Sequence, residues 1–260
     1  MDDSCKRMQR PDGHSDAPTI FLENVSFEFS GEGIFRSLHF TVEGGQWTCL
    51  IGPSGVGKST LLRLISGSLR DGFSGNIRFG DENIHEGIAA WMAQKDLLMP
   101  WLSVLENVCL GARLRGTLTT MTRQRAVTLI EDVGLGDYMH TLPFALSGGM
   151  RQRVALVRTL MEERPIILMD EPFSALDALT RLKLQDLAAE LVHGATVLMV
   201  THDPLEALRL GHRIYVMTGR PAVFSNALIP PGVPPRKPGD LEIISLQAEL
   251  INRLDAGNGP

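Results

Sequence analysis

The sequence predicts an α/β fold with a mainly parallel sheet and an inserted helical subdomain. Three observations support this prediction. Short apolar runs typical of buried strands alternate with segments of helical spacing along most of the chain. A glycine-rich loop joins one of these runs to a helical segment. A long stretch near the middle of the chain has helical spacing only.

The first elements are two strands and a strand–loop–helix unit. Thr19 to Phe29 and Leu38 to Gly45 alternate apolar and polar residues, which is the pattern of half-buried strands. The continuous apolar run WTCLI, which Ile51 ends, is typical of a buried central strand. Helical spacing follows in STLLRLISG, and Gly67 is the expected C-terminal cap.

Helical spacing then dominates from about 95 to 150, and we expect an inserted helical subdomain there. Helix and strand alternate again through a helix over 148–163 and the segments IILMD, ALTRLKLQDLAAELVHG, ATVLMV, LEALRLG and RIYVM. This alternation predicts a parallel sheet that is covered on both faces. We expect a flexible leader over 1–18, a main domain over 19–219, and a proline-rich linker with an amphipathic helix, LEIISLQAELINRL, over 220–260.

The composition argues against several classes of protein. The 260 residues are 43% hydrophobic and 21% charged, as in ordinary globular proteins. A net charge of −5 argues against general affinity for nucleic acid or anionic membranes, so phosphate binding needs a local site. The scattered Cys5, Cys49 and Cys109 predict neither a disulfide framework nor a zinc site, and favour the cytosol. We expect no secretory signal and no membrane-spanning helix, because the required apolar runs are lacking.

The glycine-rich loop GPSGVGKST matches the phosphate-binding pattern G-x-x-x-x-G-K-[ST] between a predicted strand and a predicted helix. Its glycines permit a tight turn that brings N–H groups close to phosphate oxygens, and the following helix adds its positive dipole end. Lys58 supplies charge for the β- and γ-phosphates, and the Ser59 hydroxyl is suited to ligate Mg²⁺. We expect a nucleoside triphosphate to bind the whole loop, which consists of Gly52, Pro53, Ser54, Gly55, Val56, Gly57, Lys58, Ser59 and Thr60.

This loop alone leaves several classes open, because kinases, GTPases and helicases share it. Three later segments narrow the choice: LSGGMRQRVAL over 146–156, IILMDEPFSALD over 166–177, and VTHD over 200–203. In order and content, the four segments resemble the motifs of the ABC ATPase family, over approximately 19–217. The resemblance implies ATP hydrolysis on a P-loop NTPase (RecA-like) core, with an N-terminal antiparallel β-subdomain and an inserted helical subdomain.

Residue types and resemblance together suggest roles for the first two of these segments. Ser147 is a natural N-cap, and Gly148 and Gly149 permit close approach, so we expect this helix start to be a second anion-binding site. The alternative is an ordinary capped helix start, and the position of the segment just before IILMDEPFSALD favours the anion site. At the end of a buried strand, Asp170 is similar to the family's magnesium-associated carboxylate. Its neighbour Glu171 is similar to the base that polarises the attacking water.

Four further residues resemble family motifs. Asp177 ends the segment SALD, which resembles the family's D-loop, and it is expected among the nucleotide-binding residues. His202 is similar to the histidine that contacts the γ-phosphate. Gln94 resembles the glutamine that senses Mg²⁺ and water, although an exposed glutamine without a role is the alternative. Phe29 aligns with the aromatic residue that stacks on adenine; tyrosine is commoner there, and a core position is the alternative. The expected catalytic residues are Glu171, His202, Lys58 and Gln94, and the expected magnesium ligands are Ser59, Gln94 and Asp170.

The resemblance also implies partners. Two copies would sandwich ATP and Mg²⁺ head to tail, between the glycine loop of one copy and Ser147–Gly149 of the other. The segment Gln94–Val104, in which DLLMPWLSV places apolar residues beside a proline, is expected to dock a transmembrane permease subunit. A solute-binding protein would take part indirectly, and no nucleic acid is expected. The expected location is the cytoplasmic face of the inner (plasma) membrane, as a peripheral protein.

The expected cargo follows from resemblance alone. LLMPWLSVLENV looks like the nitrate, sulfonate and taurine branch of importers, and these solutes are the alternative cargo. The tail, LIPPGVPPRKPGD followed by LQAELINRL, resembles subunits proposed to import hydroxymethylpyrimidine, a thiamine precursor, which is the predicted cargo. An exporter subunit, a soluble ABC protein of DNA repair or translation, and a phosphotransferase with the same loop are competing classes. The chain lacks the coiled-coil insertion or second cassette of the soluble ABC class, and LSGGM argues against the phosphotransferase.

Overall fold

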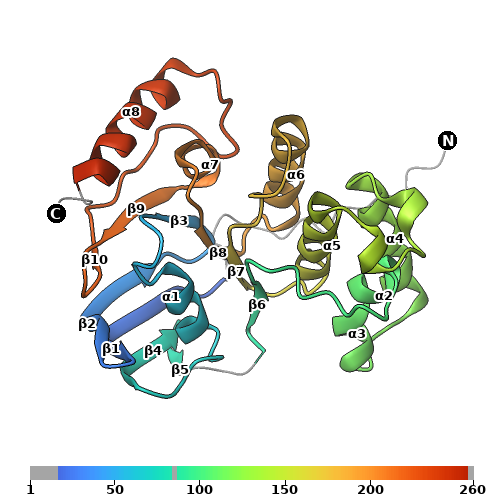
Figure 1. Cartoon of the computed structure of the whole chain (residues 1–260), viewed down its shortest axis with the longest axis horizontal. Coiled ribbons are helices and arrows are strands. Elements are labelled where there is room, and N and C mark those ends of the chain that lie inside the picture. Colours follow the sequence, from blue (N-terminus) through green and yellow to red (C-terminus); the bar gives the residue numbers. More distant parts are fainter. Residues whose placement is uncertain (1–16, 84–86, 257–260) are drawn as a thin grey trace.

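The structure, a computed structural model, describes residues 17–83 and 87–256, so the predicted leader lies almost wholly outside it. It confirms the α/β fold and its mainly parallel sheet (Figure 1). The central sheet consists of β3 (Trp47–Ile51), β6 (Ala89–Met92), β7 (Ile166–Asp170), β8 (Thr196–Val200), β9 (Arg213–Thr218) and β10 (Val223–Phe224). Its order is β10-β9-β3-β8-β7-β6, and only the short β10 runs antiparallel to its neighbour.

The predicted antiparallel β-subdomain is confirmed as a second sheet of order β2-β1-β4-β5. Its strands are β1 (Ile20–Phe29), β2 (Glu32–Val42), β4 (Phe73–Phe79) and β5 (Glu82–Asn83). The predicted strand started at Leu38, whereas β2 starts at Glu32. The earlier part was missed because Gly33, Arg36 and Ser37 interrupt the apolar alternation. The strands β4, β5, β6 and β10 were not predicted, because they are short or interrupted by polar residues and glycine.

Four of the α-helices form one group. Between β6 and β7 come α2 (Val104–Val108), α3 (Leu110–Leu114), α4 (Thr120–Asp132) and α5 (Gly148–Leu160), which gather at one end of the molecule in Figure 1. The others are α1 (Lys58–Ile65), α6 (Ala178–Leu191), α7 (Pro204–Leu210) and α8 (Leu241–Ala256). Gly67 has a φ of +72°, the left-handed conformation of a residue that follows a helix end. Within the described residues, no helix combines the length and the apolar character needed to span a bilayer.

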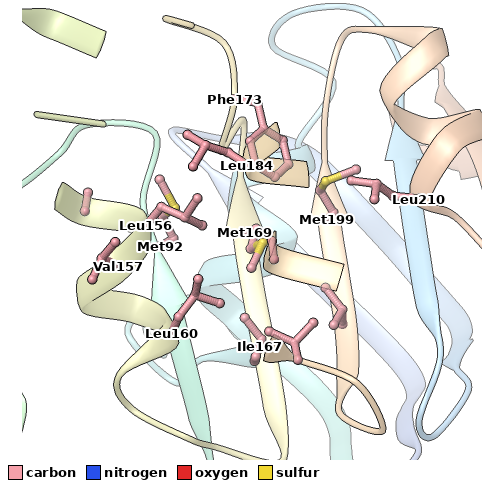
Figure 2. Close-up of a cluster of buried hydrophobic side chains, with 14 of the residues drawn as sticks. Met92, Leu156, Val157, Leu160, Ile167, Met169, Phe173, Leu184, Met199 and Leu210 are labelled. Atoms are coloured by element: carbon pink, nitrogen blue, oxygen red, sulfur yellow. The ribbon is translucent and has the colours of Figure 1, made fainter. Parts of the chain in front are cut away.

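Side chains of the parallel strands alternate between two apolar cores. On one face, Ile167 and Met169 of β7 pack in a core that includes Leu156 and Leu160 of α5 (Figure 2). On the other face, Leu168 packs in the core formed with α1 and the antiparallel sheet. Each fully buried aliphatic side chain contributes about 1.5–3 kcal/mol. The sheet is therefore fixed from both sides, and so are the positions where its strands end.

The C-terminal helix α8 packs on its own chain. Ile243 and Leu250 are 2% and 0% exposed. They belong to the same core as Ile167 and Met169, and α8 contacts α7 and β9. The guanidinium of Arg236, in the proline-rich segment before α8, donates to the carbonyls of Leu208 and Gly211 at the end of α7. These contacts hold the linker and the helix against the core.

Leu250→Ala tests the docking of α8. It should lower the free energy of unfolding by about 2–5 kcal/mol, because it opens a cavity under the helix. Ile251→Ala is the matched control: Ile251 is 41% exposed, and its truncation should cost less than about 1 kcal/mol. Urea unfolding measures both. Equal losses would contradict the packing of α8 on this core.

Candidate functional site

The carboxyl ends of four parallel strands meet at one edge of the central sheet. Leu50 of β3 lies opposite Val200 of β8, which lies opposite Asp170 of β7, and β6 pairs alongside β7. Ligands of open α/β sheets bind at this edge. The segments that follow the strands are the glycine loop after β3, Gln94 after β6, Glu171 after β7 and His202 after β8.

The glycine loop has a backbone that side chains would disrupt. A Cβ atom on Gly52 would lie 2.2 Å from the carbonyl oxygen of Met217, and one on Gly57 would lie 2.7 Å from the Ile34 side chain. Gly57 also has a φ of +111°, which side chains disfavour. Because α1 begins at Lys58, the unpaired N–H groups and the positive dipole end of α1 lie at this loop. The loop fits a polyphosphate.

Lys58 is folded into its own loop. Its Nζ donates to the carbonyls of Gly52 at 2.7 Å and Pro53 at 2.8 Å, and the residue is 8% exposed. Burial lowers the pKa of Lys58, and the neighbouring Glu171 and Asp170 oppose this shift. The ammonium is therefore held inside the loop, close to both carboxylates.

Asp170 and Ser59 bring a carboxylate and a hydroxyl oxygen next to each other. Burial raises the pKa of Asp170, and a hydrogen bond from the Ser59 hydroxyl is the largest opposing influence. Mg²⁺ in nucleotide sites binds through one or two protein oxygens, together with phosphate oxygens and water. These two residues fit that requirement. Gln94 is exposed just beyond β6, at the same edge of the sheet.

Glu171 and His202 face each other at this edge. The Nδ1 atom of His202 lies 3.3 Å from Oε2 of Glu171, whose side chain is 20% exposed. Glu171 has a φ of +51°, a left-handed conformation that costs a non-glycine residue about 1–3 kcal/mol. Its amide donates to the carbonyl of Val200 at 2.9 Å, which fixes this backbone against β8.

Gln152 of α5 holds the loop that begins at Glu171. Its Nε2 donates to the carbonyl of Glu171 at 2.9 Å and to the Ser174 hydroxyl at 3.2 Å. Its Oε1 accepts from the amide of Ala175 at 2.7 Å. The sequence analysis did not assign Gln152 a role, although Gln152 lies within the quoted segment LSGGMRQRVAL.

Ser147 is the N-cap of α5, as its residue type predicts, and its Oγ accepts from the amide of Met150 at 3.2 Å. A Cβ atom on Gly149 would lie 3.0 Å from the carbonyl of Ala175, so this helix start packs closely on the loop after Glu171. In one chain, however, α5 and α1 lie on opposite sides of β7 and β8 (Figure 1). The structure therefore separates the two predicted phosphate-binding helix starts.

Two of the predicted nucleotide contacts lie at the surface. Phe29 is 65% exposed at the end of β1, which excludes the alternative that it is a core residue. Asp177 is exposed and caps α6, where it accepts from the amide of Thr180 at 3.0 Å. Hydrogen bonds from Thr180 lower the pKa of Asp177.

A buried carboxyl group contacts Thr201, the residue before His202. Glu206, which the sequence analysis did not single out, is 4% exposed, and its Oε2 accepts from the Thr201 hydroxyl at 2.6 Å. Burial raises the pKa of Glu206 to about 7, and Asp203 adds to this effect, whereas the Thr201 hydrogen bond and Arg181 oppose it.

Glu206→Gln tests this environment through the pH dependence of stability. In the unfolded chain the carboxyl ionises near its ordinary pKa of 4.5, whereas in the folded protein it stays protonated until about pH 7. Raising the pH across this window should therefore destabilise the wild-type protein, by about 3 kcal/mol at most. Glu206→Gln should lose less stability over the same window, as measured by urea unfolding at several pH values. Parallel curves for the two proteins would contradict the raised pKa.

Comparison with known proteins identifies a family. The ABC transporter family model matches residues 35–174. An uncharacterized ABC transporter ATP-binding protein of Haemophilus influenzae is 44% identical over 239 residues, covering 90% of this chain and 98% of that protein. An aliphatic sulfonates import ATP-binding protein of Pseudomonas syringae pv. tomato is 42% identical, covering 87% of this chain and 94% of that protein.

A solved structure agrees with this assignment. It is a dimeric, post-hydrolysis state of an ATP-binding cassette bound to ADP and Pi, with a TM-score of 0.73 and 29% sequence identity. The match covers 82% of this chain and all of that one. The chain thus belongs to the ABC transporter family, as an ATP-hydrolysing ATP-binding cassette.

Proposed function

We propose that two copies of this chain bind ATP head to tail and use its hydrolysis to drive a membrane importer. The observation that carries this proposal is the separation of two phosphate-binding helix starts in one chain, α1 at the glycine loop and α5 at Ser147. A second copy supplies the missing side of each nucleotide. The dimeric cassettes among the similar solved structures support this arrangement.

Each protomer contributes most of one hydrolysis site. Lys58 and the N-terminus of α1 stabilise charge on the phosphates, and Glu171 acts as the base that orients the attacking water. His202, beside Glu171, contacts the γ-phosphate. Asp170 and Ser59, with Gln94, would hold Mg²⁺, which when bound would supply neutralising charge to the phosphates.

The outer contacts to the nucleotide come from both copies. The exposed ring of Phe29 stacks on adenine. Ser147, Gly148 and Gly149 of the second copy offer the hydroxyl and the N–H groups of a helix start to the γ-phosphate. Asp177 of the second copy lies at the exposed start of α6, at the end of the loop on which the α5 start of that same copy packs.

Glu171→Gln tests the base and the dimer together. This variant should retain MgATP binding, because Lys58 and the glycine loop remain intact. Its turnover should fall by about 10²–10⁴-fold, because the base is lost. Size-exclusion chromatography with MgATP should show a stable dimer. Lys58→Ala is the comparison variant and should bind ATP more weakly. A Glu171→Gln protein that binds MgATP but stays monomeric would contradict the sandwich.

An exposed apolar loop after β6 provides a docking surface for a permease subunit. Leu97 and Trp101 are 53% and 71% exposed. The buried side chain of Asn107 accepts from the amide of Met99 at 2.8 Å and donates to the carbonyl of Leu102 at 2.9 Å. The loop is thus held in one conformation with its apolar side chains outward. Docking there would place the chain at the cytoplasmic face of the membrane as a peripheral subunit.

The proposed cargo is an aliphatic sulfonate. Several of the similar curated proteins, including the Pseudomonas syringae relative, are named aliphatic sulfonates import ATP-binding proteins. These names support the sulfonate alternative of the sequence analysis. The thiamine-precursor prediction rests on the resemblance of the tail alone and gains no support from them.

The cargo can be tested with the chain assembled with its permease and solute-binding subunits in vesicles. An aliphatic sulfonate should stimulate ATP hydrolysis and be taken up into the vesicles. Hydroxymethylpyrimidine and nitrate serve as the contrasting arms of the assay, and taurine, which is itself an amino-substituted aliphatic sulfonate, is assayed beside an unsubstituted alkanesulfonate. Stimulation by hydroxymethylpyrimidine alone would contradict the sulfonate proposal and restore the thiamine-precursor prediction.

A further inference from the structure

A network of hydrogen bonds and an ion pair surrounds the backbone next to His202. Arg181, in the first turn of α6, donates from Nη1 to Oδ2 of Asp203 at 3.0 Å and from Nη2 to the carbonyl of Leu176 at 3.0 Å. Its Nε lies 3.6 Å from Oε1 of the buried Glu206. One guanidinium therefore joins the loop before α6, the residue after His202, and the first turn of α7.

This network fixes the backbone on both sides of His202. On one side, the Thr201 hydroxyl donates to Glu206 and accepts from the amide of Asp203 at 3.0 Å. On the other side, Asp203 caps α7, where its Oδ1 accepts from the amide of Leu205 at 2.9 Å. The imidazole of His202 is itself 62% exposed, so its placement depends on these two held neighbours.

The same guanidinium reaches the loop over 174–177. Leu176, which accepts from Arg181, directly precedes Asp177. The start of α5 packs on this loop, since a Cβ atom on Gly149 would lie 3.0 Å from the Ala175 carbonyl. In the proposed dimer that helix start faces the nucleotide of the other copy, so the loop lies next to the interface.

We infer that Arg181 is a positioning residue that ties the 174–177 loop to His202, so that the loop and the histidine move together. The position of His202 beside Glu171 then depends on a loop that borders the second copy. The inference rests on the proposed role of His202 at the γ-phosphate. Contact between the two copies would then influence hydrolysis through Arg181, although Arg181 itself contacts neither ATP nor the metal.

Three variants separate positioning from general stability. Arg181→Met removes all three contacts, and Arg181→Lys keeps the charge but not the fork of donors. Asp186→Ala is the matched control, because it breaks another ion pair between α6 and α7, Arg209 Nη2 to Asp186 Oδ1 at 2.7 Å. Each variant is assayed for MgATP affinity, for single-turnover hydrolysis and for unfolding by urea.

Arg181→Met should bind MgATP within about 3-fold of the wild type and hydrolyse it about 10-fold or more slowly, since small misplacements of catalytic groups reduce rates by up to about 10²-fold. Arg181→Lys should hydrolyse at an intermediate rate, and Asp186→Ala at the wild-type rate. Wild-type hydrolysis by Arg181→Met, or an equal rate loss in Asp186→Ala, would overturn the inference.

A double-mutant cycle with His202→Ala tests the route through the histidine. If Arg181 acts by placing His202, the double variant should hydrolyse ATP within about 2-fold of His202→Ala alone. Rate losses that multiply would overturn the inference and leave the proposed function intact. Wild-type hydrolysis by His202→Ala would instead contradict the proposed function, and this inference with it.

Discussion

The parallel register of β3, β8 and β7 is the constraint on which the site depends. Leu50, Val200 and Asp170 lie in one row, so the segments that follow these strands start from the same edge of the sheet. Apolar packing fixes the row from both faces, with alternate side chains of each strand in the two cores. Lys58, Glu171 and His202 are thus brought together by apolar packing, which stabilises the fold far more than their own polar contacts do.

The electrostatics of this edge favour a charged substrate. Buried Lys58 is held by the carbonyls of its own loop, and Asp170 lies buried beside Ser59. Burial removes part of the normal solvation of each charged form, and it therefore lowers the pKa of the lysine and raises that of the aspartate. A magnesium nucleotide would provide counter-charge to both groups. Nucleotide binding should therefore order Lys58 and Asp170. Because Glu171 follows Asp170 and its loop contacts the start of α5, that helix start should be ordered as well.

The sequence predicted those parts of the fold and site that local patterns determine. Continuous apolar runs marked β3, β7 and β8, and residue types marked the glycine loop and the cap Ser147. The apolar run IAAWMA over 88–93 contains β6 but was not predicted to be a strand, and β10 has only two residues, so sheet pairing defines both. Likewise, the amphipathic pattern predicted α8 but not its docking site. The roles of Gln152 and Arg181 escaped prediction because they depend on partners distant in the sequence. Glu171 is 19 residues from Gln152, and Asp203 is 22 residues from Arg181.

In the proposed dimer, ATP lies between the glycine loop of one protomer and the start of α5 of another. An experimental structure of the chain with a magnesium-bound, non-hydrolysable ATP analogue tests this arrangement. We expect the γ-phosphate to contact Lys58 of one copy and to accept a hydrogen bond from the Ser147 hydroxyl or the Gly149 amide of the second. A γ-phosphate bound by one copy, with the α5 start of both copies in solvent, would contradict it.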